Sequence, residues 1–378
     1  MEADAAPAAG ADDLAFMRAA LALARRGLGN VAPNPAVGCL IVRDRRIVGR
    51  GWTQPGGRPH AETEALRRAG EAARGATAYV TLEPCCHWGR TPPCTDAMIA
   101  AGLARAVIAA RDPDPRVNGE GIARLRDAGI AVTEGVLEAE AAALNAGFIL
   151  RVRAGRPLVT LKLATTLDGR IATAGGESRW ITGEAARRLA HGLRARHDAI
   201  LIGSGTALAD DPELTVRVPG LVPRGHPGPV RIVADGRARL PLTARLVATA
   251  RAVPTWVLTT PGADRHRVAA LADCGVTVIA VPPDPNGQPE PLAALRALAQ
   301  RGITRVLVEG GSRLAASLLR AGLVDRLAWF HAPSVLGGDA TPAIGALSLP
   351  HLSAMPTWRV VEEERVGPDR LLVLGTEA

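Results

Sequence analysis

Hydrophobic residues in the first part of the chain recur with helical and strand-like periods in alternation. Apolar positions follow helical spacing over 14–24, after Asp12 and Asp13, which we expect to cap that helix. Residues 37–42 and 47–52 have the short apolar runs of a β-hairpin. Beyond them, the pattern alternates between predicted helices at 60–73, 95–101 and 121–127 and predicted strands at 77–82 and 104–109. This alternation is typical of an α/β layered sheet.

A second α/β pattern follows an alanine-rich helix predicted over 137–153. Gly155 and Pro157 behind that helix are stop signals, so we place a domain boundary there. The expected division is a tail at 1–12, a first domain at 13–154 and a second domain at 155–378. Strands of the second domain are predicted at 159–163, 199–202, 230–233, 255–258, 276–279 and 306–308, with a C-terminal hairpin turning at 367–369.

The candidate chemistry of the first domain lies between its predicted elements. His60 and Glu62 are followed by Cys85, directly after a proline, and by Cys94. One imidazole and two thiols leave one position open for water on a tetrahedral zinc ion. Zinc lowers the pKa of such a water to about 7, and a nearby carboxylate can carry its proton to a departing amine. The pattern therefore predicts a hydrolytic zinc deaminase with Glu62 as general acid and base.

Two other interpretations of these residues remain open. Cys86 or His87 could supply a fourth ligand and make a closed, structural zinc site, or the thiols could be buried and metal-free. The carboxylate two positions after the histidine favours the deaminase. His60 and Glu62 lie about 200° apart around a helix, so they converge only if the start of the helix points at the metal.

The segments 81–94 (TLEPCCHWGRTPPC) and 33–38 (PNPAVG) resemble the deaminase half of the RibD family of bifunctional riboflavin-biosynthesis enzymes. The long spacing between Cys85 and Cys94 separates this family from the cytidine and tRNA-adenosine deaminases, which it otherwise resembles. The resemblance implies that Asn34 holds the edge of the substrate ring. Cys86 stands where the family usually has serine, so spacing alone does not decide which thiol of the pair binds zinc.

The second domain has no G-x-G-x-x-G fingerprint after a strand, which argues against a dinucleotide-binding Rossmann unit. Two glycine-containing turns, at 203–206 and 309–312, are candidate phosphate loops. The second leads directly into a predicted helix at 313–320, whose N-terminus favours an anion. Either turn could instead be a simple tight turn.

The segments 161–170, 176–182 and 208–217 resemble the reductase half of the same family. That domain is similar to dihydrofolate reductase and uses NADPH without a Rossmann fingerprint. The resemblance implies that the cofactor contacts Ala164, Trp180, Thr206, Asp210, Gly311 and Ser312. It implies that the substrate contacts Ser178, Arg194, Leu214, Arg217 and Glu309, of which the two arginines are suitable forks for a phosphate.

The activity implied by the family is deamination of a phosphoribosylated diaminopyrimidine, followed by NADPH-dependent reduction of the ribosyl group to a ribityl chain. The reduction needs the sugar opened to an imine, so a proton source helps. Lys162 is our candidate, because it is the only lysine among 45 basic residues and its pKa shifts easily.

Composition restricts the partners and the compartment. Five cysteines, an odd number, argue against a disulfide framework and favour the cytoplasm. The net charge of +8 comes from scattered arginines, and aromatic residues make up only 3%, so we expect no nucleic-acid partner. No apolar run predicts a membrane span. We expect a homo-oligomer acting on phosphorylated small pyrimidines. The alternatives are a nucleoside or tRNA deaminase with a degenerate second domain, and a zinc-stabilised scaffold.

Overall fold

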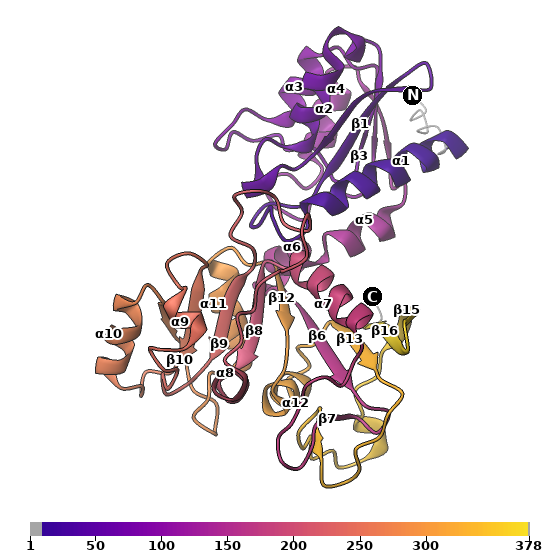
Figure 1. Ribbon diagram of the computed structural model, residues 1–378. Coiled ribbons are helices and arrows are strands. Elements are labelled where there is room, and N and C mark those ends of the chain that lie inside the picture. Colours follow the sequence, from indigo (N-terminus) through magenta and orange to yellow (C-terminus); the bar gives the residue numbers. More distant parts are fainter. Residues whose placement is uncertain (1–9, 377–378) are drawn as a thin grey trace. The chain divides into compact units, whose positions relative to one another are not determined.

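The computed structural model describes residues 10–376 and divides the chain into two compact units, Met1–Ala154 and Gly155–Ala378 (Figure 1). The tail predicted at 1–12 falls mostly on residues 1–9, outside the described part. The positions Ala11 and Asp12 already belong to the first helix.

Unit 1 is a three-layer α/β/α domain built on a five-stranded sheet of order β2-β1-β3-β4-β5. Strand β1 is antiparallel to β2 and β3, whereas β3, β4 and β5 run parallel. Helices α1 and α5 lie on one side of the sheet and α2, α3 and α4 on the other (Figure 1). The strands are β1 Gly38–Arg43, β2 Arg46–Trp52, β3 Thr77–Val80, β4 Arg105–Ile108 and β5 Ala131–Glu134. The helices are α1 Ala11–Ala24, α2 Ala61–Ala69, α3 Cys94–Ala100, α4 Glu120–Asp127, α5 Glu138–Leu144 and α6 Ala146–Ala154.

The cap predicted for the first helix is wrong. Gly10 is the N-cap of α1, and Asp12 and Asp13 lie in its first turn. The Asp13 carboxylate accepts a hydrogen bond from the Gly10 amide at 3.2 Å and two from Arg105 at 3.0 and 2.8 Å. An acidic side chain in the first turn is stabilised by the positive end of the helix dipole, and here the arginine on β4 also holds it at the sheet.

The single helix predicted over 137–153 is split by Asn145 into α5 and α6. Backbone hydrogen bonds continue through the break, from Asn145 N to Ala141 O and from Ile149 N to Asn145 O. The Asn145 side chain, 3% exposed, points instead at buried backbone of a distant segment. Asparagine side chains compete with the backbone for such bonds, which favours interruption of a helix.

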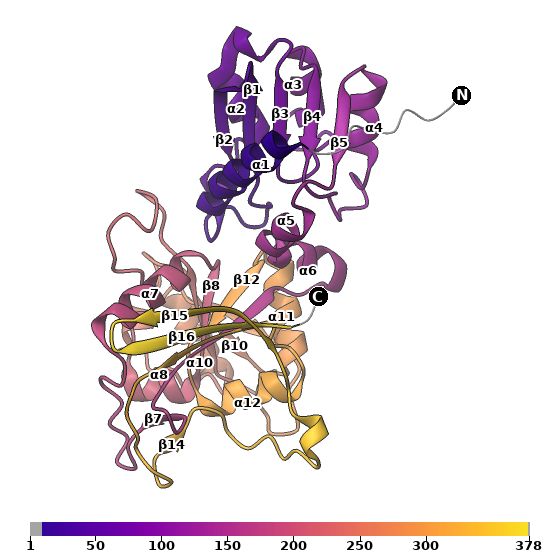
Figure 2. The same cartoon turned by 90° about the vertical axis from the view of Figure 1, so that its right-hand side faces the viewer.

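Unit 2 is built on a nine-stranded sheet of order β11-β10-β9-β8-β12-β6-β13-β16-β15. The strands from β11 to β13 run parallel, and β16 and β15 complete the sheet in antiparallel orientation (Figure 2). They are β6 Leu158–Thr165, β8 Ala199–Gly203, β9 Val230–Ala234, β10 Thr255–Thr259, β11 Thr277–Ala280, β12 Arg305–Val308, β13 Arg326–His331, β15 Arg359–Val366 and β16 Asp369–Gly375. A separate short pair joins β7 Arg170–Ala172 to β14 Thr341–Pro342.

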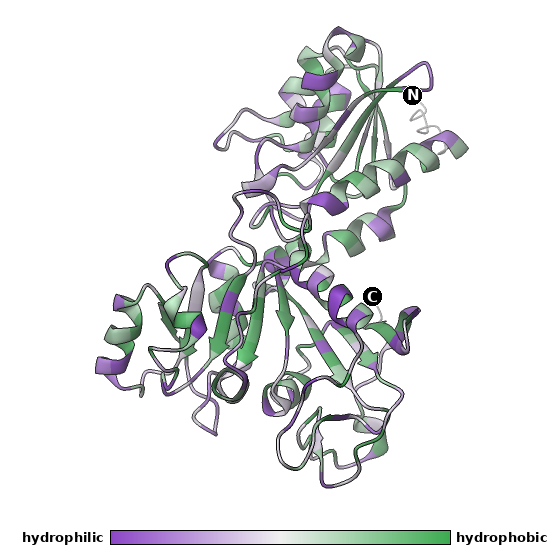
Figure 3. Ribbon diagram, in the orientation of Figure 1, coloured by the Kyte–Doolittle hydropathy of each residue, from purple (hydrophilic) through white to green (hydrophobic). Residues whose placement is uncertain are grey.

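Helices pack on the sheet of unit 2 with their apolar faces inward, and the strands form the most hydrophobic part of the unit (Figure 3). They are α7 Glu184–Ala195, α8 Ser204–Asp210, α9 Arg245–Ala248, α10 Arg265–Asp273, α11 Pro291–Gln300 and α12 Ser312–Arg320. The sequence prediction omitted β5 in unit 1 and β7, β13 and β14 in unit 2. Within residues 10–376, no helix is both long enough and apolar enough to span a bilayer.

Candidate active sites

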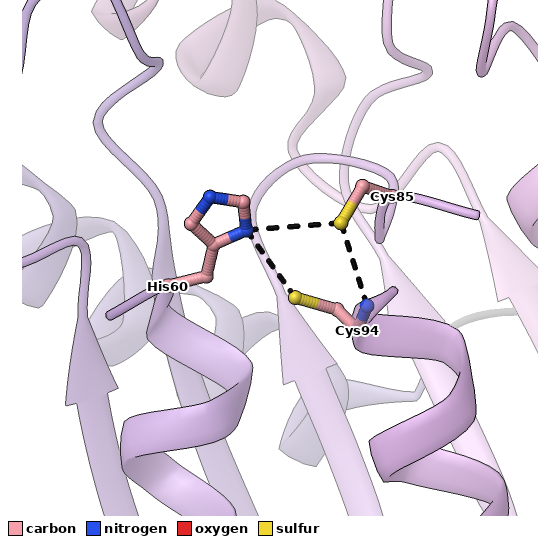
Figure 4. Close-up of side chains that lie close together, drawn as sticks. All are labelled: His60, Cys85 and Cys94. Carbon is pink, nitrogen blue, oxygen red and sulfur yellow. Dashed lines mark hydrogen bonds between the residues drawn. The ribbon is translucent and has the colours of Figure 1, made fainter. Parts of the chain in front are cut away.

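The predicted metal ligands of unit 1 converge where two helices begin. His60 is the N-cap of α2, Cys94 is the first residue of α3, and Cys85 lies in the loop between β3 and α3 (Figure 4). Gly51 on β2 makes this possible, because a Cβ at that position would overlap the Ala61 carbonyl oxygen. The start of α2 therefore lies directly on the sheet, beside the metal donors. This is the placement that the sequence requires if His60 and Glu62 are to converge.

The three donor atoms fit a zinc ion. His60 Nδ1 lies 3.4 Å from Cys94 Sγ and 3.7 Å from Cys85 Sγ, and all three donors lie within 4.8 Å of one another. Zinc bonds of about 2.3 Å to sulfur and 2.0 Å to nitrogen at tetrahedral angles place N and S about 3.5 Å apart. The observed spacings bracket that value, so the side chains are arranged for zinc.

The surroundings of Cys85, the thiol in the loop, favour the thiolate form that binds a cation. The Cys94 amide, at the start of α3, donates to Cys85 Sγ at 3.4 Å, as Figure 4 shows. Hydrogen bonds from Cys94 and His60 outweigh burial and lower the pKa of Cys85 to about 4. A thiolate is the form that binds metal, and helix N-termini stabilise it.

Glu62 lies beside the cluster without joining it. The side chain is 4% exposed, and its Oε2 makes no hydrogen bond with any described residue. Burial raises the pKa of Glu62 to about 7. A buried oxygen without a partner, next to three metal donors, is placed to bind a water or a substrate amine. Its pKa suits a group that accepts and releases a proton near neutral pH.

The described residues do not close the metal site with a fourth side chain. The group of candidate ligands contains His60, Cys85 and Cys94, and neither Cys86 nor His87 belongs to it. Cys86 instead donates its thiol proton to the Arg116 carbonyl, with an S···O distance of 3.6 Å. This geometry disfavours the structural zinc site and the scaffold. It also favours Cys85 over Cys86 as the ligand.

Asn34 lies next to the loop that leads into the metal cluster. Its Nδ2 donates to the Gly57 carbonyl oxygen at 2.8 Å, and Gly57 precedes His60 by three residues. Among residues 10–376 its Oδ1 has no hydrogen-bond partner. The free acceptor could take a hydrogen bond from a ring amine.

The second site is a half-buried charged cluster in unit 2. Arg194 on α7 makes two hydrogen bonds, of 2.6 and 2.8 Å, to Glu309, which directly follows β12. Lys162 on β6 is the neighbour of Glu309 across the parallel β12–β6 pair, since Val308 is paired with Leu161. Burial opposes ionisation of Glu309, but the charge and hydrogen bonds of Arg194 lower its pKa to about 2. Burial also lowers the pKa of Lys162.

This arrangement changes which of the two arginines, Arg194 or Arg217, is expected to bind a phosphate. The fork of Arg194 is occupied by Glu309, and its third nitrogen donates to the Thr215 carbonyl oxygen at 2.9 Å. Arg217 is exposed, with a loose ion pair to Glu213 at 3.6 Å. Arg217 is therefore the arginine more accessible to a phosphate. Leu214 is buried in the same loop, with a positive φ of 50°.

The two glycine turns of unit 2 come together because β8 and β12 are neighbouring parallel strands. Gly311 has a φ of 90°, and a Cβ there would lie 3.4 Å from the Thr206 hydroxyl. The segment 203–206, predicted as a candidate phosphate loop or a tight turn, forms the start of a helix. Gly203 is the N-cap of α8, which includes Thr206, while Gly311 is the N-cap of α12, which begins at Ser312. Two helix starts thus lie close together, an arrangement that suits an anionic cofactor group.

The other predicted contacts are distributed around these groups. Arg179 donates to the Asp210 carbonyl oxygen at 3.2 Å, which ties the segment of the exposed Trp180 to the end of α8. Ser178, partly buried, lies in the same segment, and Ala164, also partly buried, lies on β6. The structure records no polar contact that joins Ser178 or Ala164 to the charged cluster.

Comparison with known proteins covers nearly the whole chain. Residues 11–110 match the cytidine and deoxycytidylate deaminase zinc-binding region, and residues 157–372 match the RibD C-terminal domain. The chain is 45% identical over 367 residues to the riboflavin biosynthesis protein RibD of Escherichia coli strain K12, covering 95% of this chain and 98% of that protein. The chain belongs to the RibD family. It is a bifunctional deaminase and reductase of riboflavin biosynthesis.

Solved structures of the family have the same fold. Acinetobacter baumannii RibD (form 1) has a TM-score of 0.87 at 39% identity, covering 97% of this chain and 99% of that chain. A Thermotoga maritima diaminohydroxyphosphoribosylaminopyrimidine deaminase/5-amino-6-(5-phosphoribosylamino)uracil reductase has a TM-score of 0.83 at 36% identity, with the same coverage. The predicted fold, a cytidine-deaminase-like domain followed by a reductase domain, is confirmed. Zinc and NADPH are the cofactors that these two RibD domains imply.

Sequence reasoning missed several buried or half-buried polar residues around the sites. His191 on α7 accepts from the Arg217 amide at 3.3 Å, and Glu83 accepts four hydrogen bonds from the backbone of residues 112–122. Thr53 and Asn145 bind the backbone of the 35–37 segment. Only Asn145 carried a visible signal, because a polar amide interrupts an alanine-rich helix.

Proposed function

We propose that unit 1 deaminates a 2,5-diamino-6-(5-phosphoribosylamino)pyrimidin-4(3H)-one and that unit 2 reduces the ribosyl group of the product to a ribityl chain. The observation that carries the first half is the three-donor cluster beside a buried carboxylate, one oxygen of which has no hydrogen-bond partner among the described residues. The name of the Thermotoga maritima relative, a diaminohydroxyphosphoribosylaminopyrimidine deaminase, supports the identity of the substrate.

His60, Cys85 and Cys94 would hold the zinc ion in unit 1. Zinc bound there supplies an activated water by lowering its pKa. Glu62 takes the proton of that water and delivers it to the departing amine, a role that suits its pKa of about 7. Asn34 Oδ1 accepts a hydrogen bond from the ring and fixes its orientation. The remaining requirement is exclusion of bulk water, which burial of Cys94 and Glu62 serves.

In unit 2, NADPH supplies the hydride for the sugar carbon. Thr206, Gly311 and Ser312 would hold the cofactor at the two helix starts, with Ala164, Trp180 and Asp210 around it. Ser178, Arg194, Leu214, Arg217 and Glu309 would bind the substrate. Within that set Arg217 meets the phosphate and the Arg194–Glu309 pair orients the sugar. Lys162, whose pKa burial lowers, donates the proton that assists opening of the sugar.

The partners and the compartment complete this proposal. The ligands are phosphorylated pyrimidines and not nucleic acid or membrane, and the enzyme is a homo-oligomer. A cytoplasmic location is supported by the five free cysteines and by the bacterial biosynthetic relatives.

The test uses the purified full chain with the phosphoribosylated diaminopyrimidine, with and without NADPH. Ammonia release follows the deaminase, and the nicotinamide absorbance follows the reductase. We expect ammonia in both arms and NADPH oxidation only after deamination. Ammonia from cytidine or tRNA with no NADPH oxidation would instead indicate the alternative editing deaminase. Zinc bound without either reaction would indicate a scaffold.

A further inference from the structure

Asn145 pairs with both backbone polar groups of a single residue, Ala36, which lies 109 positions earlier in the chain. The Ala36 amide donates to Asn145 Oδ1 at 2.9 Å, and Asn145 Nδ2 donates to the Ala36 carbonyl oxygen at 3.1 Å. Both residues are buried, with exposures of 3% and 2%. The side-chain amide thus satisfies both the N–H and the C=O of Ala36, as a residue of a neighbouring antiparallel strand would.

The segment around Ala36 depends on side chains because β1 begins only at Gly38. The Thr53 hydroxyl accepts from the Val37 amide and donates to the Pro35 carbonyl, both at 3.0 Å. Asn145 adds two more hydrogen bonds to this segment from a different part of the chain. It lies at the break between α5 and α6, whereas Thr53 follows β2. Together with the backbone bond from Thr53 N to Val37 O at 2.9 Å, these two buried polar side chains fix the path of residues 35–37.

Asn34 directly precedes this segment, and its position follows from the path of residues 35–37. Its Nδ2 is bound to Gly57 O at 2.8 Å, while its Oδ1 has no partner within residues 10–376. A shift of the Ala36 peptide would move the Asn34 backbone directly, because the two residues are separated only by Pro35. The rigid φ of proline transmits such a shift with little local compensation.

We propose that Asn145 is a positioning residue of the deaminase: it holds the Ala36 peptide so that Asn34 Oδ1 faces the pyrimidine. This inference rests on the proposed role of Asn34 and adds a residue to it from a separate part of the chain. Asn145 touches neither the metal donors nor the substrate and acts through Ala36 and Asn34. Loss of its two hydrogen bonds leaves a buried N–H and a buried C=O without partners, which favours displacement of the segment.

The experiment compares Asn145→Leu, which keeps the branched shape of the side chain without its polar atoms, with Asn145→Ala, which also opens a cavity. We expect about a tenfold rise in KM for deamination in both variants, with kcat within about threefold of the wild type, because ring orientation is lost while Glu62 and the donors stay in place. Zinc content and reductase turnover of the same molecules should not change. Thr133→Val is the matched control. Thr133 is buried, and its hydroxyl accepts a hydrogen bond at 3.0 Å from Arg105, the first residue of β4.

Coupling to Asn34 separates positioning from a general structural role. Asn34→Ala alone should raise KM, and adding Asn145→Leu should raise it no further if Asn145 acts through Asn34. Fully additive effects would overturn the proposal. So would an unchanged KM in Asn145→Leu, or an equal fall in kcat and zinc content at constant KM.

A measurement without substrate keeps this inference distinct from the proposed function. Hydrogen exchange of the amides at 36–38 should accelerate in Asn145→Leu, while the strand at 77–80 keeps its wild-type protection. Unchanged exchange at 36–38 would refute the positioning role even if the enzyme is active. Faster exchange in a protein that does not deaminate the pyrimidine would leave Asn145 as the anchor of this segment and refute the assigned substrate.

Discussion

Two glutamates, the buried Glu62 of unit 1 and the half-buried Glu309 of unit 2, have opposite electrostatic environments. Glu62 has an oxygen with no partner among the described residues, and burial raises its pKa to about 7. Glu309 receives two hydrogen bonds from Arg194, and the charge of that arginine lowers its pKa to about 2. The comparison teaches that burial alone does not assign a role. The first carboxyl can exchange a proton near neutral pH, whereas the second is a permanent anion that organises cations.

The two sites also differ in how the chain assembles them. The metal donors lie between positions 60 and 94 and converge through two adjacent helix starts. The charged cluster joins β6, α7 and the end of β12, from position 162 to position 309. Local spacing determines the first site, and sheet topology determines the second.

The largest effect should come from Glu62→Gln. An amide of nearly the same size cannot move the proton, so deaminase kcat should fall about a thousandfold, within the range of general acid–base catalysis. Zinc content should remain that of the wild type, because Glu62 is not among the donors. Ammonia release, metal analysis and NADPH oxidation on one sample check this expectation.

Glu64→Gln is a suitable control for that variant, because Glu64 lies on the same helix and is bound by Arg67 and Arg68. It should keep deaminase turnover within about twofold, since a partly exposed ion pair contributes little. Deamination that survives in Glu62→Gln would assign the proton transfer to another group.

A smaller effect, about a hundredfold on reductase kcat/KM, should follow Glu309→Gln. The substitution leaves the buried charges of Arg194 and Lys162 without their anion, which is destabilising as well as harmful to binding. Deaminase turnover in the same molecule is the internal control. Wild-type reductase kinetics in Glu309→Gln would show that the pair has no role in the site.

The Glu309 ion pair also predicts a pH dependence. Its folded-state pKa of about 2 lies below the ordinary value of about 4.3, so its stabilisation is complete above pH 4.3 and is lost as the pH falls towards 2. The difference in the free energy of unfolding between wild type and Glu309→Gln should therefore narrow over that interval. Denaturation followed at several acidic pH values measures this difference.

The contrast between the sites also explains which features the sequence could predict. The metal donors and Glu62 were predicted because their chemistry is contained in one motif and one resemblance. The strands on either side of the sites were found from their apolar runs. The α1 cap was misplaced because an acidic pair was taken for a cap, whereas Asp13 pairs with Arg105, which lies 92 positions away.

Long-range polar contacts were beyond the reach of sequence patterns. The engagement of Arg194 by Glu309 joins residues 115 positions apart, and Asn145 reaches Ala36 across 109. Nothing local marks such partners, since their meeting depends on strand order and on which helix covers which face. The phosphate fork expected of Arg194 needed revision for this reason.

The smallest of these effects, about tenfold to thirtyfold on reductase turnover, is expected for Lys162→Met. Burial lowers the pKa of Lys162, so the protonated donor form is lost as the pH rises, and wild-type turnover should decline on the alkaline side. The methionine variant should lose that decline along with the rate. Lys162→Arg is the discriminating partner, because it keeps a positive charge beside Glu309 yet does not release its proton. Equal losses in both variants indicate proton donation, whereas a near-normal rate in Lys162→Arg means that the site needs only the charge. In that case Lys162 and Glu309, the charged residues of the β12–β6 pair, both keep their charge during the reaction. Glu62 is then the titrating group that distinguishes the first site from the second.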